Sequence, residues 1–430
     1  MLLLASLGAS QPLPAAPSEG AALDEKIILV QPAGNDREDA EIGRWQARIS
    51  AADAGKRPSV GNYERLGWAY VAKARRTLDA GYYKLAEKTA DVMDARFGAT
   101  NEALLLRGHV YHNLHRFKEA EEVAKQLVHN RGIAFDYALL SDALMEQGRL
   151  EESVAACQKM MALRPGVDAY SRAANLRWLT GDLTGAVEAM EAAVRAGSPL
   201  DATTTAWTLS RLSAYYLQDG RAGDALRVAG SANSLAPDYP PALLAEGRAF
   251  LALQKPGLAV GVLAKAEELN PLPEYQWWLA DALAAAGRRD DAAVVEKRLL
   301  AGGALSDPRT LALYLATRRE DAPAAVRIAS AELSNRGDVF TKDALAWALQ
   351  ANGDLQAASA AMREALASST KDARLFLHAG VIASRCGDSD AAKHYFAEAN
   401  KYAWTLTPSE HALLETLIGT TAPAVEARTS

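Results

Sequence analysis

The sequence is poor in cysteine, in charge of one sign and in long apolar runs. Its 430 residues include only two cysteines, Cys157 and Cys386, and 47 Lys and Arg stand against 53 Asp and Glu. Two thiols cannot form a disulfide scaffold or a cysteine-rich zinc fold, so we interpret both as unpaired packing residues. The net charge of −6 gives no positive field for nucleic acid, and we expect no nucleic-acid partner. Beyond the first residues, no run approaches the roughly 18 apolar residues of a membrane span.

The sequence also lacks the short motifs that carry common enzyme chemistry. It contains no phosphate-binding loop, no dinucleotide-binding glycine fingerprint, no G-x-S-x-G and no H-E-x-x-H. Catalysis needs a convergent nucleophile, base and electrophile, or a metal ion, and the sequence indicates no such set. We therefore expect no enzymatic activity and no cofactor.

What the sequence has instead is a regular repeat. A turn residue, often Gly, is followed five positions later by a small residue, and eight of the nine steps between successive turns are 33 or 34 residues. The ten pairs are Gly81/Ala86, His115/Ala120, Gly148/Ser153, Gly181/Ala186, Gly220/Ala225, Gln254/Ala259, Gly287/Ala292, Glu320/Ala325, Gly353/Ala358 and Gly387/Ala392. Gly can end a helix at positive φ, and a small residue in the next helix lets the two approach closely. The pattern predicts an all-α chain of helix-turn-helix units that must stack to bury their apolar faces.

The repeat resembles the tetratricopeptide repeat over about residues 60–406. The matching residues are Leu66, Gly67, Tyr70, Gly108, Tyr111, Ala120, Gly247, Phe250 and Ala259 in the helices, and the closing prolines Pro165, Pro237 and Pro271. The resemblance implies a right-handed superhelical α-solenoid of about ten units with capping helices. It also implies a non-enzymatic scaffold that binds a protein or peptide partner on the concave surface lined by the first helix of each unit. The sequence is similar to exported bacterial members of this family whose function is not assigned.

The two ends of the chain have different compositions from the repeats. Residues 1–20 are first Leu-rich and then Pro-rich, the order of a secretory signal peptide and its cleavage zone, although no basic residue precedes the apolar core. Two interpretations stay open: a signal for export to the periplasm, or a disordered apolar terminus, with the cytoplasm as the alternative location. Residues 21–59 form an N-terminal segment with a cap helix, and they include an apolar run at 23–30 whose structure the sequence does not settle.

A capping helix is predicted at the other end, over residues 407–418. Thr407 is suited to the N-cap and Pro408 to the first helical position. We expect this helix to cover the open end of the stack. The tail at 419–430 completes the chain.

The candidate binding site follows from the resemblance, which places certain positions of each first helix on the concave face. The residues at these positions are Trp68, His109, Asp142, Asn175, Trp178, Trp207, Arg248, Trp277, Tyr314 and Trp347. Exposed aromatic residues are typical anchors of an interface, so we expect an aromatic lining that holds the partner. The alternative is that the tryptophans belong to the core, and at Trp277 the neighbouring Trp278 is an equal candidate for burial.

A second hypothesis is a carrier of an apolar small molecule or a metal. His109 and His112 are three residues apart on one helix, and Asp142 from the next unit could complete a metal site with them. The other interpretation of these histidines is that they are solvated or hydrogen-bonded side chains. The sequence indicates no oligomeric state.

Overall fold

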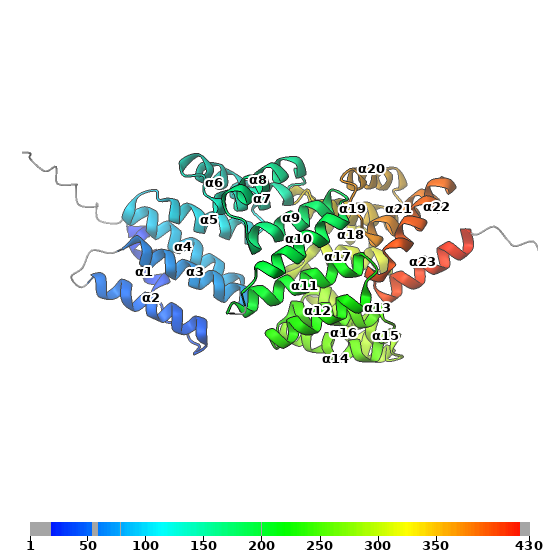
Figure 1. Cartoon of the computed structure of the whole chain (residues 1–430), viewed down its shortest axis with the longest axis horizontal. Helices are drawn as coiled ribbons and strands as arrows, with labels where there is room; N and C mark the ends of the chain where they lie inside the picture. The colour runs from blue at the N-terminus through cyan, green and yellow to red at the C-terminus, as the bar shows by residue number, and fades with distance from the viewer. Residues whose placement is uncertain (1–18, 54–58, 78, 199, 422–430) are drawn as a thin grey trace, which may run out of the picture. The chain divides into compact units, whose positions relative to one another are not determined.

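The chain folds into helices joined by short turns over residues 19–53, 59–77, 79–198 and 200–421, which the computed structural model describes (Figure 1). Within these ranges there is no β-strand. The helices are α1 Glu19–Ile28, α2 Arg37–Asp53, α3 Val60–Thr77, α4 Ala80–Phe97, α5 Asn101–Asn113, α6 Phe117–Asn130, α7 Ala134–Glu146, α8 Leu150–Leu163, α9 Val167–Leu179, α10 Leu183–Ala196, α11 Ala202–Gln218, α12 Ala222–Leu235, α13 Pro240–Ala252, α14 Pro256–Leu269, α15 Pro273–Ala285, α16 Arg289–Ser306, α17 Pro308–Arg318, α18 Ala322–Asn335, α19 Val339–Asn352, α20 Leu355–Leu366, α21 Ala373–Arg385, α22 Ser389–Lys401, the 3₁₀ turn η1 Ala403–Thr405, and α23 Pro408–Thr421. Residues 1–18 of the predicted signal segment and most of the predicted tail lie outside these ranges.

The helices from α3 to α22 pack as consecutive pairs, α3 with α4 and so on to α21 with α22. The prediction of an all-α chain of about ten helix-turn-helix units is therefore confirmed. The closing prolines Pro165, Pro237 and Pro271 each lie two residues beyond the end of a second helix. Proline cannot continue a helix, so it separates one pair from the next.

The turns between paired helices occur at eight of the ten predicted residues. Positive φ angles are found at His115, Gly148, Gly181, Gly220, Gln254, Gly287, Gly353 and Gly387. The prediction is wrong at Gly81, which lies inside α4, because the Asp79 side chain accepts a hydrogen bond from the Gly81 N–H and starts the helix earlier. It is also one residue late at Glu320, because α17 ends at Arg318 and the left-handed residue is Arg319.

The small residues after each turn are buried between the helices of their pair. Nine of the ten are alanines and the tenth is Ser153, whose hydroxyl donates to the backbone oxygen of Ser141 at 2.7 Å. The least buried of the set, Ala292, is 5% exposed. Glycines allow similarly close approach elsewhere: a Cβ at Gly380 would lie 2.4 Å from Cε1 of the buried Phe396 on the paired helix.

Substituting Gly380 by Ala should destabilise the protein by about 0.5–2 kcal/mol. Overpacking against Phe396 costs about 1–3 kcal/mol, and the better helix propensity of Ala returns about 1 kcal/mol. The matched control is Gly230→Ala, where a Cβ would have no neighbour within 4 Å and only the gain in propensity should remain. Urea unfolding followed by circular dichroism measures both variants, and equal effects at the two positions would contradict the close-packing account.

The chain divides into two compact units, residues 1–132 and residues 133–430, which we call the N-terminal and C-terminal units. The predicted repeat region at 60–406 extends across both. In the N-terminal unit, the predicted cap residues Ile42, Trp45 and Ile49 are buried on α2, which packs against α3. Most of the apolar run that the sequence left unassigned forms part of α1, which packs against α4.

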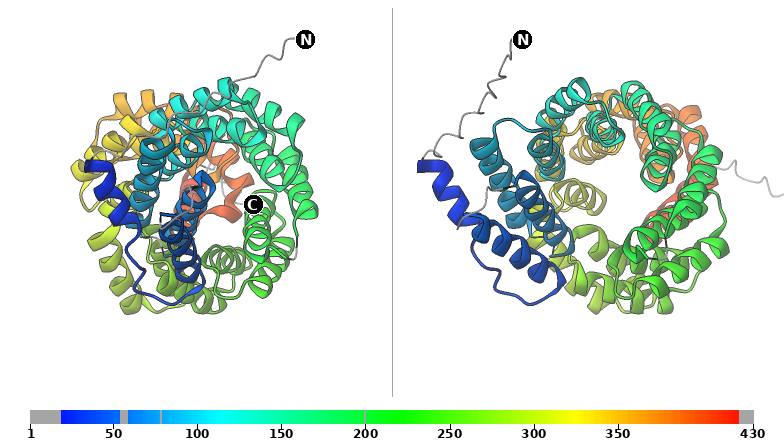
Figure 2. Two further views of the ribbon diagram at one scale, coloured as in Figure 1. Left: turned by 90° about the vertical axis from the view of Figure 1, so that its left-hand side faces the viewer. Right: turned by 60° about the vertical axis from the view of Figure 1, so that its left-hand side comes forward.

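The helices of the C-terminal unit coil so that its last pairs return to its first pairs (Figure 2). The indole N–H of Trp178 donates to the backbone oxygen of Lys371 at 2.8 Å, and the Thr370 hydroxyl donates to that of Leu179 at 2.8 Å. Arg336 pairs with Glu146 at 2.6 Å. These contacts between residues about 190 positions apart hold the first helices of this unit around a common inner face.

The predicted capping helix is α23, and it begins as the sequence indicates. The Thr407 N–H donates to Glu410 Oε2 at 3.0 Å, and the Glu410 N–H donates to Thr407 Oγ1 at 3.4 Å, which is a capping box. Helix α23 packs against α22, the end of the stack, and it also contacts α15. Since α15 is a first helix three pairs earlier, the C-terminal segment reaches the inner face.

Candidate functional site

A cavity of about 180 Å³ lies on the inner face of the C-terminal unit. The first helices α13, α15, α17, α19 and α21 line it, together with Thr405 of η1. Its apolar walls are Trp277, Trp278, Leu313 and Phe340. Its charged lining consists of the cations Arg248, Arg309 and Arg374 and the carboxylates Glu274, Asp307, Asp343 and Asp372.

Most of these charged groups already have partners in the fold. Arg374 pairs with Glu410 of α23 at 2.5 and 3.0 Å, and Arg309 pairs with Asp338 at 3.3 Å. The Asp307 side chain accepts from the N–H of Thr310 at the start of α17. Such contacts stabilise a charge that burial would otherwise penalise.

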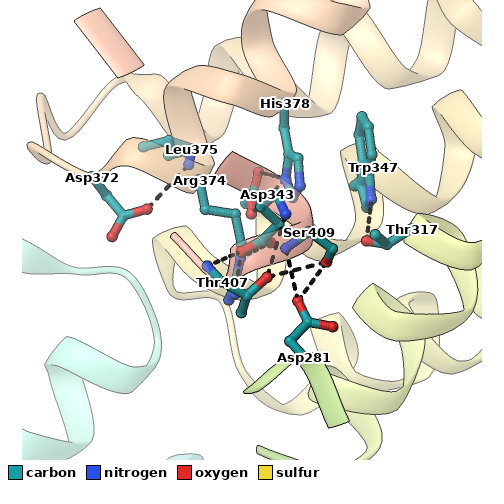
Figure 3. A network of polar contacts seen from close by, with 11 residues as sticks. Asp281, Thr317, Asp343, Trp347, Asp372, Arg374, Leu375, His378, Thr407 and Ser409 are labelled. Carbon is teal, nitrogen blue, oxygen red and sulfur yellow. Dashed lines mark hydrogen bonds and ion pairs between the residues drawn. The ribbon is translucent and has the colours of Figure 1, made fainter. Parts of the chain in front are cut away.

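A polar network extends from the cavity to α23 (Figure 3). Asp281 of α15 accepts from the Ser409 hydroxyl at 2.5 Å, from the Ser409 N–H at 3.1 Å and from Arg318 at 3.0 Å. Asp343 lies 2.9 Å from Nδ1 of His378. This network fixes the N-terminal end of α23 on the inner face.

Three charged groups in and next to the cavity have shifted pKa values. Burial raises the pKa of Asp372, although the N–H of Leu375 donates to its carboxylate at 3.1 Å and acts against the rise. Burial alone would also raise the pKa of Glu410, but the Arg374 guanidinium outweighs it and lowers that pKa. Burial lowers the pKa of Arg248, and nearby Glu274 opposes this only in part.

Glu410 should therefore stabilise the protein in a pH-dependent manner. Its folded pKa lies below the unfolded value of about 4.3, so its contribution is complete above that value and is lost as the pH falls through the folded pKa. The variant Glu410→Gln carries a permanently neutral group. The difference in urea midpoint between wild type and this variant should be large at neutral pH and should shrink below about pH 4. A difference that stays constant with pH would contradict the assignment.

Arg248 is the exception among the cations of the cavity. Its Nε is fully enclosed and has no hydrogen-bond partner, and no carboxylate among the described residues comes within ion-pair distance of it. Its guanidinium carbon lies 4.8 Å from the centre of the Trp278 ring. The cavity thus contains a cation beside an aromatic ring, and its Nε–H has no hydrogen-bond acceptor among the described residues.

The structure brings two of the predicted site residues, Arg248 and Trp277, into the lining of this cavity. It places others of the C-terminal unit in separate contacts. Asp142 forms a bidentate pair with Arg172 at 2.8 and 2.7 Å, and Asn175 donates to the sulfur of Met145 at 3.0 Å. Their side chains are therefore engaged in packing between neighbouring units.

The expectation of an exposed aromatic lining is wrong for three of the six predicted tryptophans and tyrosines. Trp277, Tyr314 and Trp347 are buried, and Trp278 is buried as well, so both members of that pair lie in the core. The physical reason is that each ring packs on a ring of the next unit. The ring pairs are Trp68–His109, Trp178–Tyr215, Trp277–Tyr314 and Trp347–His378.

Trp207, which lies on α11, differs from these residues because it is 38% exposed. Trp178 is half-buried and stacks on Phe340 with ring centroids 5.4 Å apart. Of the predicted aromatic anchors in the C-terminal unit, Trp207 alone thus keeps the exposure that an anchor for a partner needs.

In the N-terminal unit, the two histidines of the metal hypothesis face aromatic neighbours. His109 lies against Trp68 with ring centroids 5.1 Å apart and contacts Arg75, whereas His112 meets the edge of Phe117 at 5.4 Å. No group of three or more His, Cys, Asp or Glu side chains is placed to hold a metal ion in the described part of the chain. The metal hypothesis with Asp142 gains no structural support.

Sequence reasoning missed Asp343, Asp372 and Arg374, although a signal for two of them existed. Counted from the turn residue as position fifteen, Arg374 is at position two and Asp343 at position five of their units. These are positions expected on the concave face, but the search there gave weight to aromatic residues. The same count for charged residues would have selected both.

These observations define an all-α helical-repeat protein whose first helices carry a charged cavity. The chain matches the family model of the tetratricopeptide repeat over two segments, residues 138–202 and 244–307. No curated protein is significantly similar to it in sequence. Repeats of this family generally mediate protein–protein interaction, and scaffolds of this type are typically non-enzymatic. No helix in the described ranges is long and apolar enough to cross a membrane.

Several solved structures of low sequence identity are similar to this chain to different extents. A monomeric mutant of human IFIT1 with m7Gppp-AAAA is similar with a TM-score of 0.50 and 12% identity, over 88% of this chain and 99% of that one. The APC/C hetero-tetramer Cut9–Hcn1 matches 94% of this chain and 92% of that one at 14% identity and a TM-score of 0.37. MamA matches 38% of this chain and 94% of that one at 17% identity and a TM-score of 0.31.

Proposed function

We propose that the chain is a non-enzymatic scaffold that binds a protein partner on the inner face of the C-terminal unit. The observation that supports this most is the cavity on that face, to which five successive first helices contribute and in which Arg248 has no carboxylate partner among the described residues. Exposed Trp207 on α11 adds an aromatic anchor of the kind that concentrates binding energy.

Site-specific photo-crosslinking in the native host tests this proposal. A photoreactive phenylalanine analogue replaces Thr310, which lines the cavity on α17, and in a matched variant it replaces Leu258, which is 57% exposed on the second helix α14. We expect one protein to be captured from Thr310 and not from Leu258. Its affinity for the purified chain should fall in the variant Trp207→Ala. Capture of the same proteins from both positions would contradict a specific inner-face site.

We also propose that the protein is exported to the periplasm, because the Leu-rich and then Pro-rich order of residues 1–20 is that of a signal peptide. Mass spectrometry of the mature N-terminus in the native host tests this. Cleavage near residue 20 supports export, and a cytoplasmic protein that retains Met1 contradicts it.

A further inference from the structure

Arg248 lacks a carboxylate partner among the described residues. Other enclosed arginines of the unit have carboxylate partners: Arg172 with Asp142, Arg318 with Asp281, Arg336 with Glu146 and Arg374 with Glu410. A guanidinium cannot lose its proton in a protein, so it cannot escape the cost of burial by becoming neutral. An anion from outside the chain would supply the carboxylate partner that Arg248 lacks among the described residues.

The geometry around Arg248 favours a planar anion. The Arg248 guanidinium carbon lies over the Trp278 ring, 4.8 Å from its centre, and the N–H groups at the edge of a guanidinium form a planar fork. A carboxylate matches this edge with two parallel hydrogen bonds. The anion would thus complete the same type of pair that Glu410 makes with Arg374 across the cavity.

The charges of the lining restrict which anion can enter. Three arginines face four carboxylates, so the cavity as a whole carries no excess of positive charge. A phosphate group or a nucleic acid would bring two or more negative charges close to Glu274, Asp343 and Asp372, which is unfavourable. A ligand with one carboxylate and one positive group is compatible with the arginines and the carboxylates of the lining.

Two carboxylates of the cavity, those of Glu274 and Asp372, lie near Arg248 and could bind such a positive group. Glu274 and Asp372 both act electrostatically on Arg248, yet neither forms an ion pair with it. In the part of the chain that the structure describes, Glu274 is exposed without an ion-pair partner, and Asp372 accepts hydrogen bonds from the Leu375 N–H and the Gln218 amide. An ammonium group placed between them and the Arg248-bound carboxylate would have acceptors of opposite charge.

The size and the walls of the cavity complete the description. About 180 Å³ is below the roughly 300–1,000 Å³ of sites for drug-sized ligands. Trp277, Leu313 and Phe340 supply apolar surface beside the charges. We propose that this cavity binds a free α-amino acid with an apolar or aromatic side chain, its carboxylate on Arg248 and its ammonium group toward Asp372 and Glu274. This site shares the cavity and Arg248 with the proposed partner surface, and a peptide probe distinguishes a free amino acid from the end of a partner chain.

Isothermal titration calorimetry of the purified full chain tests the proposal, with L-leucine and L-phenylalanine as probes. We expect saturable binding of at least one of them, with an affinity about tenfold or more weaker in Arg248→Gln. Glu274→Gln, at an exposed position that should not affect folding, should also weaken binding. The matched control is Arg227→Gln, which removes an exposed cation on α12 and should leave the affinity unchanged.

Modified probes keep the test decisive if a variant fails to fold. L-phenylalaninamide lacks the carboxylate and N-acetyl-L-phenylalanine lacks the ammonium group, and both should bind the wild type more weakly than L-phenylalanine. The proposal is overturned if neither amino acid binds at concentrations on the order of 10 mM, where even weak sites fill. It is also overturned if the modified probes or Arg248→Gln bind equally well, or if a peptide ending in the same residue binds more tightly than the free amino acid.

Discussion

Replacing Glu410 by Ala should lower the free energy of unfolding by about 3–5 kcal/mol, because it leaves the Arg374 guanidinium without its partner. The Glu410 side chain is 2% exposed and that of Arg374 28%, so water can solvate the abandoned charge only in part. The substitution also removes the capping box of α23, which by itself contributes about 1 kcal/mol. Urea unfolding followed by tryptophan fluorescence measures the loss.

A double variant separates the charge from the packing. Arg374→Met with Glu410→Leu removes both charges and fills the space with apolar groups, and such replacements of a buried pair are often close to neutral. We expect the double variant to be clearly more stable than Glu410→Ala alone. If Glu410→Ala costs less than about 1 kcal/mol, the ion pair is not what holds the C-terminal segment on the inner face.

Most of the fold could be predicted from the sequence, since its determinants are local. A residue that tolerates positive φ, such as Gly181, ends a first helix, and a small residue five positions later, such as Ala186, is buried where the helices touch. Both rules act within one pair. The return of the last pairs to the first, through Trp178 and Lys371, depends on small rotations summed over many units, and no single repeat encodes it.

The candidate site was predicted less well than the fold. The resemblance directs attention to the first helices, and two of the residues that it selects, Arg248 and Trp277, line the cavity. The aromatic residues were misleading, because a large ring between two first helices can pack on the next unit instead of facing solvent. Trp347 packs in this way on His378, with ring centroids 4.0 Å apart. Whether a ring is exposed depends on its neighbour one repeat later, which single-unit reasoning does not consider.

Arg248 is the residue on which the functional account depends most. An enclosed charge without a partner destabilises the fold, and natural proteins retain such groups where binding requires them. Replacing Arg248 by Leu removes the charge and keeps an apolar side chain over Trp278. We therefore expect this variant to be more stable than the wild type, by about 1–3 kcal/mol.

The urea midpoint of Arg248→Leu, measured beside that of Arg374→Leu without added ligand, tests this claim most directly. The account predicts opposite signs: the midpoint rises for Arg248→Leu, and it falls for Arg374→Leu because Glu410 is left buried and unpaired. A fall of similar size in both variants would contradict the account, because Arg248 would then serve the stability of the fold and not the binding of a ligand.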